Sequence, residues 1–257
     1  MNIYVLLKRT FDTEEKITIS GGKINEDGAE FIINPYDEYA VEEAIQVREV
    51  HGGEVTVITI GTKEAEKQLR TALAMGADKA VLINTEEDLE SSDQFTTAKI
   101  LAEFLKDKQI DLIIGGNVAI DGGSGQVGPR VAQLLNIPYV TTITKLTIDG
   151  NKVTVVRDVE GDSEVIETTL PVLVTAQQGL NEPRYPSLPG IMKAKKKPLD
   201  ELELDDLELD VDDVLPKTKT IELFLPPKKE AGKILTGDLQ DQVKELVALL
   251  HSEAKVV

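Results

Sequence analysis

The sequence predicts an α/β fold: a mostly parallel sheet flanked by helices, then antiparallel hairpins, then an extended C-terminal arm. Two changes of pattern predict this order. Short apolar runs alternate with helical periodicity through the first 140 residues, and apolar–polar alternation follows Tyr139. The last 80 residues show neither pattern. Alternating strands and helices are typical of right-handed βαβ units, which build parallel sheets.

In the first part, four apolar runs indicate strands, and stretches with one apolar face indicate the helices between them. A short alternating stretch at 16–20, before Gly21 and Gly22, indicates a hairpin arm. The expected strands span 3–7, 54–60, 79–83 and 111–114, and the expected helices span 37–50, 65–76 and about 98–105.

Beyond Tyr139 the alternation indicates antiparallel hairpins at 144–148, 153–157 and 164–168, separated by glycine-containing turns. They lead into one more buried strand at 172–175. The predicted sheet is therefore mixed.

The last 80 residues predict an appendage without a core of its own. Four prolines interrupt residues 183–198, and nine carboxylates fall within residues 200–213. An amphipathic helix is expected at 239–250. We therefore expect a domain at 1–198 and an arm at 199–257. Such an arm is either disordered or laid on another protein, and its apolar residues favour the second interpretation.

Composition excludes several classes of function. The chain of 257 residues has no run of 18 apolar residues, and a strand-like segment follows Met1 directly, so neither a membrane span nor a signal peptide is expected. It lacks cysteine and has two distant histidines, so we expect no metal site, no cysteine nucleophile, no histidine-based catalytic triad and a cytoplasmic location. The net charge of −18 argues against nucleic acid as a partner.

A glycine-dense loop between the strand ending near Ile114 and a helix beginning near Gln126 carries the strongest chemical signal. Glycines let backbone N–H groups approach a phosphate, and a helix N-terminus adds partial positive charge. The lysine of a Walker P-loop is missing. The loop is either a sharp turn or a site that holds a nucleotide by its backbone without hydrolysing it.

Two further segments, one at 34–37 and one at 186–197, are candidates for binding a ligand or a partner. Residues 34–37, Asn-Pro-Tyr-Asp, either initiate a helix or bring Asn34 to a base or ribose. The basic run at 193–197 is expected to be a solvated helix end. Just before it, Leu188 lies between Pro186 and Pro189, where a stiff loop can present it to a partner.

Several of these segments together resemble the electron transfer flavoprotein β-subunit family. Residues 155–175 are similar to its signature segment, and residues 181–197 are similar to its recognition loop and following helix. The resemblance also includes residues 34–37, 42–44, 70–78 and 119–121, so it covers nearly the whole chain in order.

The resemblance implies a Rossmann-like fold of the adenine-nucleotide-binding type, with AMP buried in this subunit and redox-active FAD held mainly by an α subunit. It implies an electron carrier, not an enzyme, that accepts electrons from acyl-CoA and other dehydrogenases and passes them to a membrane quinone oxidoreductase and the respiratory chain. The residues it implies at the nucleotide are Leu6, Asn34, Pro35, Tyr36, Asp37, Ile60, Gly116, Asp121, Gly122, Gly123, Ser124, Gly125, Gln126 and Val127.

Partner contacts are implied at the recognition loop, about 180–197, with Leu188 at its tip and the arm wrapped on the α subunit. Asp158 is expected either to face the flavin domain of that subunit or to lie beside a surface pair formed by Arg157. The implied partner-binding residues are Asp158, Tyr185, Pro186, Leu188, Ile191 and Met192.

The phosphate loop departs from the family's AMP-binding pattern, Asn-Gln-Thr-Gly, by reading Gly-Gln-Val-Gly at 125–128. It is closer to members whose β subunit holds a second FAD and which bifurcate electrons. AMP is favoured as the family's default ligand, with a second FAD as the alternative. A different class, a nucleotide-binding stress-type regulatory module, shares the fold but lacks the signature segment and the recognition loop.

Overall fold

The computed structural model describes residues 1–89, 91–229 and 231–256. The chain forms two compact units: the first contains Met1–Ile17 and Asn25–Ile221, and the second contains Thr18–Ile24 and the segment from Glu222 onward.

A nine-stranded sheet is the centre of the first unit, with the strand order β11-β10-β9-β12-β8-β1-β6-β7-β13. All neighbours from β9 to β13 are parallel, whereas β10 is antiparallel to β9 and β11, so the sheet is mixed as predicted. The strands are β1 (Asn2–Leu6), β6 (Glu54–Gly61), β7 (Lys79–Asn84), β8 (Leu112–Gly116), β9 (Tyr139–Asp149), β10 (Lys152–Val159), β11 (Asp162–Thr169), β12 (Val172–Ala176) and β13 (Leu199–Leu202).

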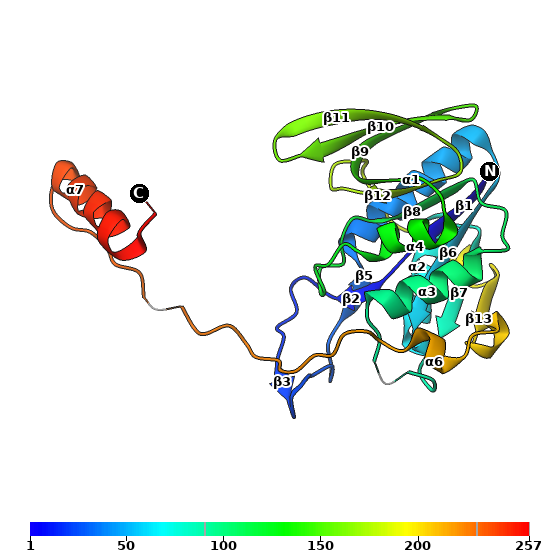
Figure 1. Cartoon of the computed structure of the whole chain (residues 1–257), viewed down its shortest axis with the longest axis horizontal. Helices are drawn as coiled ribbons and strands as arrows, with labels where there is room; N and C mark the ends of the chain where they lie inside the picture. The colour runs from blue at the N-terminus through cyan, green and yellow to red at the C-terminus, as the bar shows by residue number, and fades with distance from the viewer. Residues whose placement is uncertain (90, 230, 257) are drawn as a thin grey trace. The chain divides into compact units, whose positions relative to one another are not determined.

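Helices cover both faces of this sheet (Figure 1). On one face α1 and α2 pack through Ile45 and Leu69, and on the other α3 and α4 pack through Leu105 and Val131. The central strands are buried on both sides, as the continuous apolar run at 112–114 predicts for parallel strands. The helices of the first unit are α1 (Pro35–His51), α2 (Glu66–Met75), α3 (Gln94–Leu105), α4 (Val127–Leu135), α5 (Leu188–Ala194) and α6 (Val211–Val214), with short 3₁₀ turns η1 (Lys63–Ala65) and η2 (Asp205–Leu207).

The acidic segment after Pro198 packs on the first unit. Strand β13 pairs in parallel with β7, and beyond it Leu204, Leu209 and Val214 are buried against the face that carries α3. The first unit thus extends to Ile221, past the boundary expected at residue 198, because these apolar residues share its core. A short antiparallel pair that the sequence did not predict, β2 (Arg9–Phe11) with β5 (Phe31–Ile33), also belongs to this unit.

The second unit holds the predicted hairpin arm and the terminal helix. Strands β3 (Ile19–Ser20) and β4 (Lys23–Ile24) are joined by Gly21 and Gly22, both with positive φ. Helix α7 (Leu239–Leu249) is capped by Asp238, whose carboxylate accepts hydrogen bonds from the N–H groups of residues 240 and 241, and the π-helical turn η3 (Leu250–Ala254) follows. Four exposed large apolar side chains of α7 share one helical stripe: Leu239, Val243, Leu246 and Val247.

Candidate functional site

A cavity of about 250 Å³ lies at the carboxyl ends of β1, β6 and β8. After β7 the chain crosses to the other side of β1 to form β8, so this is the switch point at which open α/β sheets bind ligands. Pro35, Tyr36 and Asp121 are not among the lining residues. The cavity brings together these expected site residues: Leu6, Asn34, Asp37, Ile60, Gly116, Gly122, Gly123, Ser124, Gly125, Gln126 and Val127.

Asn34 connects the start of α1 to the glycine loop. Its amide donates to the carbonyl oxygen of Val118 at 3.0 Å and accepts from the N–H of Ile120 at 3.1 Å. Asn34 is the residue that precedes α1, but its side chain makes no capping hydrogen bond to the helix. Its side chain therefore shapes the loop that follows β8.

Asp37 joins two strand ends at the floor of the cavity. Its carboxylate accepts from the backbone N–H of Lys8 at 2.7 Å and from that of Gly116 at 2.9 Å. Burial raises the pKa of Asp37 to about 7, against the opposing effect of hydrogen bonds from Lys8, Asn34 and Gly116. Two hydrogen bonds to distant backbone groups make this side chain a structural tie between β1, α1 and β8.

Gly116 leaves space that this tie requires. A Cβ atom there would lie 2.2 Å from Oδ1 of Asp37 and 2.7 Å from Cβ of Tyr36. The need for glycine comes from this close approach of α1 to the end of β8.

The glycine loop ends in an N-terminus that its own side chains do not cap. Gly123 and Gly125 have φ values of +66° and +60°, a region that favours glycine. Gln126 precedes α4, yet its side chain makes no hydrogen bond to the first helical N–H groups and accepts from Arg130 instead, at 2.9 Å from Nη2. The first N–H groups of α4 are therefore suited to bind an anion.

Lys8 and Asp121 form an ion pair beside the cavity, with 2.7 Å between Nζ and the carboxylate. Lys8 lines the cavity and follows β1 directly, whereas Asp121, which was expected at the nucleotide, contacts Lys8. Sequence reasoning missed Lys8 because it belongs to none of the glycine-rich motifs. The end of a strand at the switch point is the signal that could have found it.

The start of α3 forms another part of the lining that was not predicted. Asp93, its N-cap, accepts from the N–H groups of Phe95 and Thr96 with one oxygen and from those of Lys217 and Thr218 with the other. Although burial raises it, hydrogen bonds led by that of Thr96 lower the pKa of Asp93 to about 2. Asn117, Val118 and Ala119 also line the cavity and belong to the loop at 116–127 that was expected there. The lining residues that the sequence did not predict are Leu7, Lys8, Ile58, Thr59, Gly61, Thr85, Ser92, Asp93, Gln94, Thr97, Leu101, Gly115 and Gly128.

Five of the six expected partner-binding residues, all except Asp158, lie in α5 or just before it. Leu188 is the first residue of α5 and is 81% exposed, and Tyr185 is 94% exposed. Ile191 and Met192 are also exposed, and Pro186 and Ile191 line a shallow groove against α2. Four apolar side chains thus gather on one short segment of the first unit.

The basic run differs from the expected solvated helix end at its last residue. Lys197 is half-buried, and its ammonium group donates to the carbonyl oxygens of Leu73, at 3.0 Å, and Ala77. Burial lowers the pKa of Lys197. This lysine therefore caps the end of α2.

Asp158 lies on β10 and is exposed, while its neighbour Arg157 faces Glu164 across the hairpin at 3.8 Å. Among the residues that the structure describes, no cation pairs with Asp158.

Within residues 1–89, 91–229 and 231–256, no helix is long and apolar enough to cross a membrane, and no group of three or more His, Cys, Asp and Glu side chains could hold a metal ion.

A family model described as "Electron transfer flavoprotein domain" matches residues 21–207. The chain is also 70% identical over 257 residues to the electron transfer flavoprotein subunit beta of Bacillus subtilis strain 168, and the match covers all of both chains. The chain belongs to the electron transfer flavoprotein family. It is a β subunit, which implies an α subunit as its partner.

More distant relatives match over nearly their whole length. The subunit beta of Mus musculus is 36% identical over 248 residues, which cover 94% of this chain and 96% of the relative. The caffeyl-CoA reductase-Etf complex subunit CarD of Acetobacterium woodii is 37% identical over 248 residues, which cover 95% of each. The predicted resemblance to electron transfer flavoprotein β subunits is confirmed, and the stress-type regulatory module is set aside because the chain belongs to this family.

Proposed function

We propose that this β subunit holds one AMP in the cavity at the ends of β1, β6 and β8, and forms a cytoplasmic heterodimer with an α subunit that holds the redox-active FAD. The heterodimer accepts electrons from acyl-CoA and other dehydrogenases and passes them to a membrane quinone oxidoreductase of the respiratory chain. The observation that carries the AMP assignment is the glycine loop ending at the uncapped N-terminus of α4.

The dimensions and charge of the cavity favour AMP over a second FAD. Ligand pockets commonly measure roughly 300–1,000 Å³, and this cavity of about 250 Å³ is slightly smaller than that range. Lys8 is the single basic side chain among the described lining residues, and Asp121 already neutralises it. Backbone N–H groups with one paired lysine suit a single phosphate better than a diphosphate.

A second candidate is a bifurcating component that holds a second FAD here. Two observations favour it: Val127 offers no hydroxyl to a phosphate, and CarD, named as a subunit of a caffeyl-CoA reductase-Etf complex, is 37% identical. In that case the β subunit takes part in an enzyme complex and is not only a carrier.

Acid extraction of the purified heterodimer separates the two candidates. We expect one AMP and one FAD for each heterodimer, measured by chromatography of the extract against the protein concentration. Two FAD and no AMP would establish the bifurcating candidate. An extract that holds FAD but no second nucleotide would contradict both.

A variant pair then tests the loop itself. Gly125→Val places a β-branched residue at a φ of +60°, where the built Cβ lies 3.2 Å from the carbonyl oxygen of Asn117. We expect its heterodimer to lose AMP while the flavin spectrum stays normal, because FAD is held by the α subunit. Gly150→Val is the control, since it places the same side chain at a φ of +58° in a turn outside the cavity lining. Loss of the flavin spectrum would show that the loop holds the redox cofactor.

We further propose that the exposed segment around α5 docks the electron-donating dehydrogenase, with Leu188 as its anchor, and that the part of the arm from residue 222 onward packs on the α subunit. Leu188 does not pack back on the first unit, since it is 81% exposed. Burying one leucine in a partner's pocket is worth roughly 1.5–3 kcal/mol. In this proposal, the α subunit binds the arm by covering the exposed apolar stripe of α7.

A further inference from the structure

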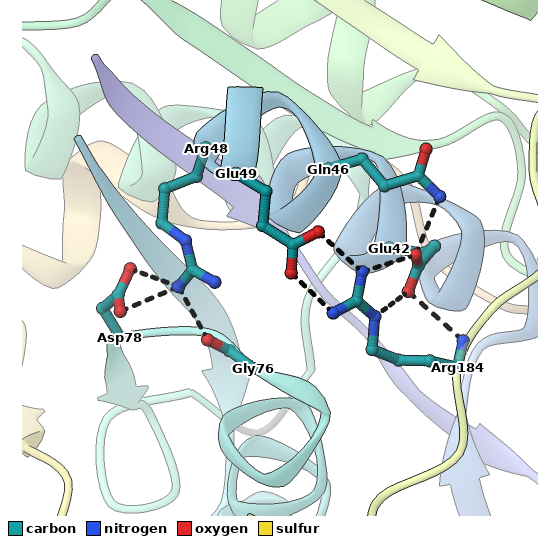
Figure 2. Close-up of polar contacts among 7 residues, drawn as sticks. All are labelled: Glu42, Gln46, Arg48, Glu49, Gly76, Asp78 and Arg184. Atoms are coloured by element: carbon teal, nitrogen blue, oxygen red, sulfur yellow. Dashed lines mark hydrogen bonds and ion pairs between the residues drawn. The ribbon is translucent and has the colours of Figure 1, made fainter. Parts of the chain in front are cut away.

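The segment that carries the exposed apolar residues begins immediately after Arg184, and this arginine holds it to α1 (Figure 2). Figure 2 shows the guanidinium between two carboxylates, Glu42 and Glu49, which lie seven residues apart on α1. Seven residues are close to two helical turns, so both carboxylates project from one face. The arginine therefore bridges two turns of the helix.

The guanidinium binds both carboxylates in a forked geometry. Towards Glu42, Nε and Nη2 donate at 2.8 and 2.9 Å. Towards Glu49, Nη1 and Nη2 donate at 2.7 and 3.2 Å. Such bidentate contacts fix the direction of the side chain, which a single ammonium group cannot do.

The backbone is held as well as the side chain. The N–H of Arg184 donates to Oε2 of Glu42 at 3.2 Å, and Gln46 donates to Oε1 of the same carboxylate at 2.8 Å. The side chain of Glu42 is only 4% exposed. Although burial raises it, the hydrogen bonds from Arg184 and Gln46 lower the pKa of Glu42. The buried carboxylate of Glu42 therefore fixes the position of Arg184, where the exposed segment begins.

The far end of the segment is held to α2. A Cβ atom at position 190 would lie 2.5 Å from the carbonyl oxygen of Ala74. The close approach of α5 to α2 therefore requires glycine at this position. Arg70 donates from Nη1 to the carbonyl oxygens of Ala194 and Lys197, each at 3.0 Å. Residues 185–193 thus run between two fixed ends.

We propose that Arg184 is a positioning residue for dehydrogenase docking: its double carboxylate clamp holds Tyr185 and Leu188 outward before the partner arrives. This inference rests on the proposed docking function of α5. A clamped segment has already lost the freedom that a mobile one would lose on binding, so docking costs less ordering entropy. Arg184 itself need not touch the partner.

Arg48 provides a matched control on the same helix. Its Nη1 donates to both carboxylate oxygens of Asp78, at 2.8 and 2.9 Å, and to the carbonyl oxygen of Gly76 at 2.9 Å (Figure 2). These hydrogen bonds hold α1 to the turn before β7, and none of them reaches the segment after Arg184. Arg48→Lys therefore weakens an arginine clamp of the fold without releasing the docking segment.

The test uses the whole heterodimer as electron acceptor for an acyl-CoA dehydrogenase reduced by its own acyl-CoA. Arg184→Lys, Leu188→Ala, the double variant and Arg48→Lys are compared by the KM for the heterodimer, by kcat and by melting temperature. We expect Arg184→Lys to raise KM about threefold to tenfold, the change that ordering one or two side chains implies, with kcat unchanged. Arg48→Lys should leave KM unchanged.

The double variant distinguishes positioning from a general loss of structure. Because Arg184 acts through Leu188 and its neighbours, Arg184→Lys should add little to the KM of Leu188→Ala. Fully additive effects, or a wild-type KM for Arg184→Lys beside a raised KM for Leu188→Ala, would overturn the positioning role alone. A wild-type KM for Leu188→Ala would overturn the proposed docking function and the positioning role together.

Hydrogen exchange gives a readout that needs no dehydrogenase. The backbone N–H groups of Gly190 and Ile191, which donate to Ser187, should exchange faster in Arg184→Lys and at the wild-type rate in Arg48→Lys. Glu49→Gln serves if Arg184→Lys folds poorly, because Glu49 is half exposed and its loss leaves the buried Glu42 contact intact. Unchanged hydrogen exchange in both Arg184→Lys and Glu49→Gln would show that Arg184 does not fix the segment.

Discussion

The carboxylate of Asp37 accepts a hydrogen bond from the backbone N–H of Gly116, 2.9 Å away, although 79 residues separate them in the sequence. The same carboxylate accepts from the N–H of Lys8 at 2.7 Å. One buried side chain at the start of α1 therefore sets the spacing of β1 and β8, which form the floor of the candidate nucleotide site.

Gly116→Ala should disrupt this tie. The new methyl group would lie 2.2 Å from the Asp37 carboxylate and would force α1 away from β8, an overpacking cost of about 1–3 kcal/mol. Urea unfolding should show this loss for Gly116→Ala and a much smaller one for the neighbouring Gly115→Ala. At Gly115 the built Cβ has its nearest contact at 3.4 Å, to Leu6. Equal stability of both variants would contradict the close-approach argument.

Asp37 should make stability depend on pH in an unusual direction. Its pKa is raised from 3.8 to about 7, so ionisation is harder in the folded chain than in the unfolded chain. Its contribution to stability is therefore complete below about pH 4 and is lost as the pH rises through 7. The melting-temperature advantage of the wild type over Asp37→Asn should shrink between pH 4 and pH 8. An advantage that is constant over this range would refute the raised pKa.

Asp93 should show the opposite dependence and should hold the segment at 217–218. Its pKa is lowered from 3.8 to about 2, so its contribution is present above pH 4 and is lost as the pH falls through 2. At pH 7, Asp93→Ala should cost about 1–3 kcal/mol in urea unfolding and should speed tryptic cleavage after Lys217. The control is Asp210→Ala, which removes the cap of α6 but no contact to residues 217–218. Equal cleavage in both variants would argue against the Asp93 contact.

The arm should be protease-sensitive in the isolated subunit from about residue 222 onward. Residues 222–229 are exposed, and Lys228 and Lys229 offer tryptic sites. Adding the α subunit should protect them, because the proposed contact buries the stripe of α7. Mass spectrometry of the fragments locates the cuts. Cleavage at the same rate with and without the α subunit would count against this packing.

Asp158→Ala should change electron transfer more than stability. Asp158 is exposed, so a transient ion pair with a cation of the α subunit would shift the position of the flavin domain by less than about fivefold in its equilibrium constant. The rate of electron transfer should change by no more than the same factor. Asp162→Ala, on the neighbouring strand, controls for the loss of one surface carboxylate. A lowered melting temperature with an unchanged rate would instead indicate a structural role within the hairpin.

Periodicity predicted the parallel core and the hairpin strand β10 because buried apolar residues, such as Val153 and Val155, fix those strands. It also predicted β11, where alternation is present although no residue is buried. It missed β13, whose sequence Leu-Asp-Glu-Leu has no alternation and which becomes a strand only by pairing with β7. It also missed the role of Asn34 and Asp37, whose hydrogen-bond partners lie between 29 and 86 residues away. Short motifs reveal residue types, whereas tertiary pairing decides what they contact.

The two strands at the borders of the nine-stranded sheet both carry carboxylates. Strand β13 contains Asp200 and Glu201, and β11 contains Asp162, Glu164 and Glu167. An open border offers unpaired backbone groups to any other extended chain, and like charges there repel a second copy of the same border. Glu164, Glu167 and Glu201 pair with cations, whereas Asp162 and Asp200 form no ion pair among the described residues. We expect these two carboxylates to oppose edge-to-edge aggregation, and their replacement with neutral β-branched residues to remove that protection.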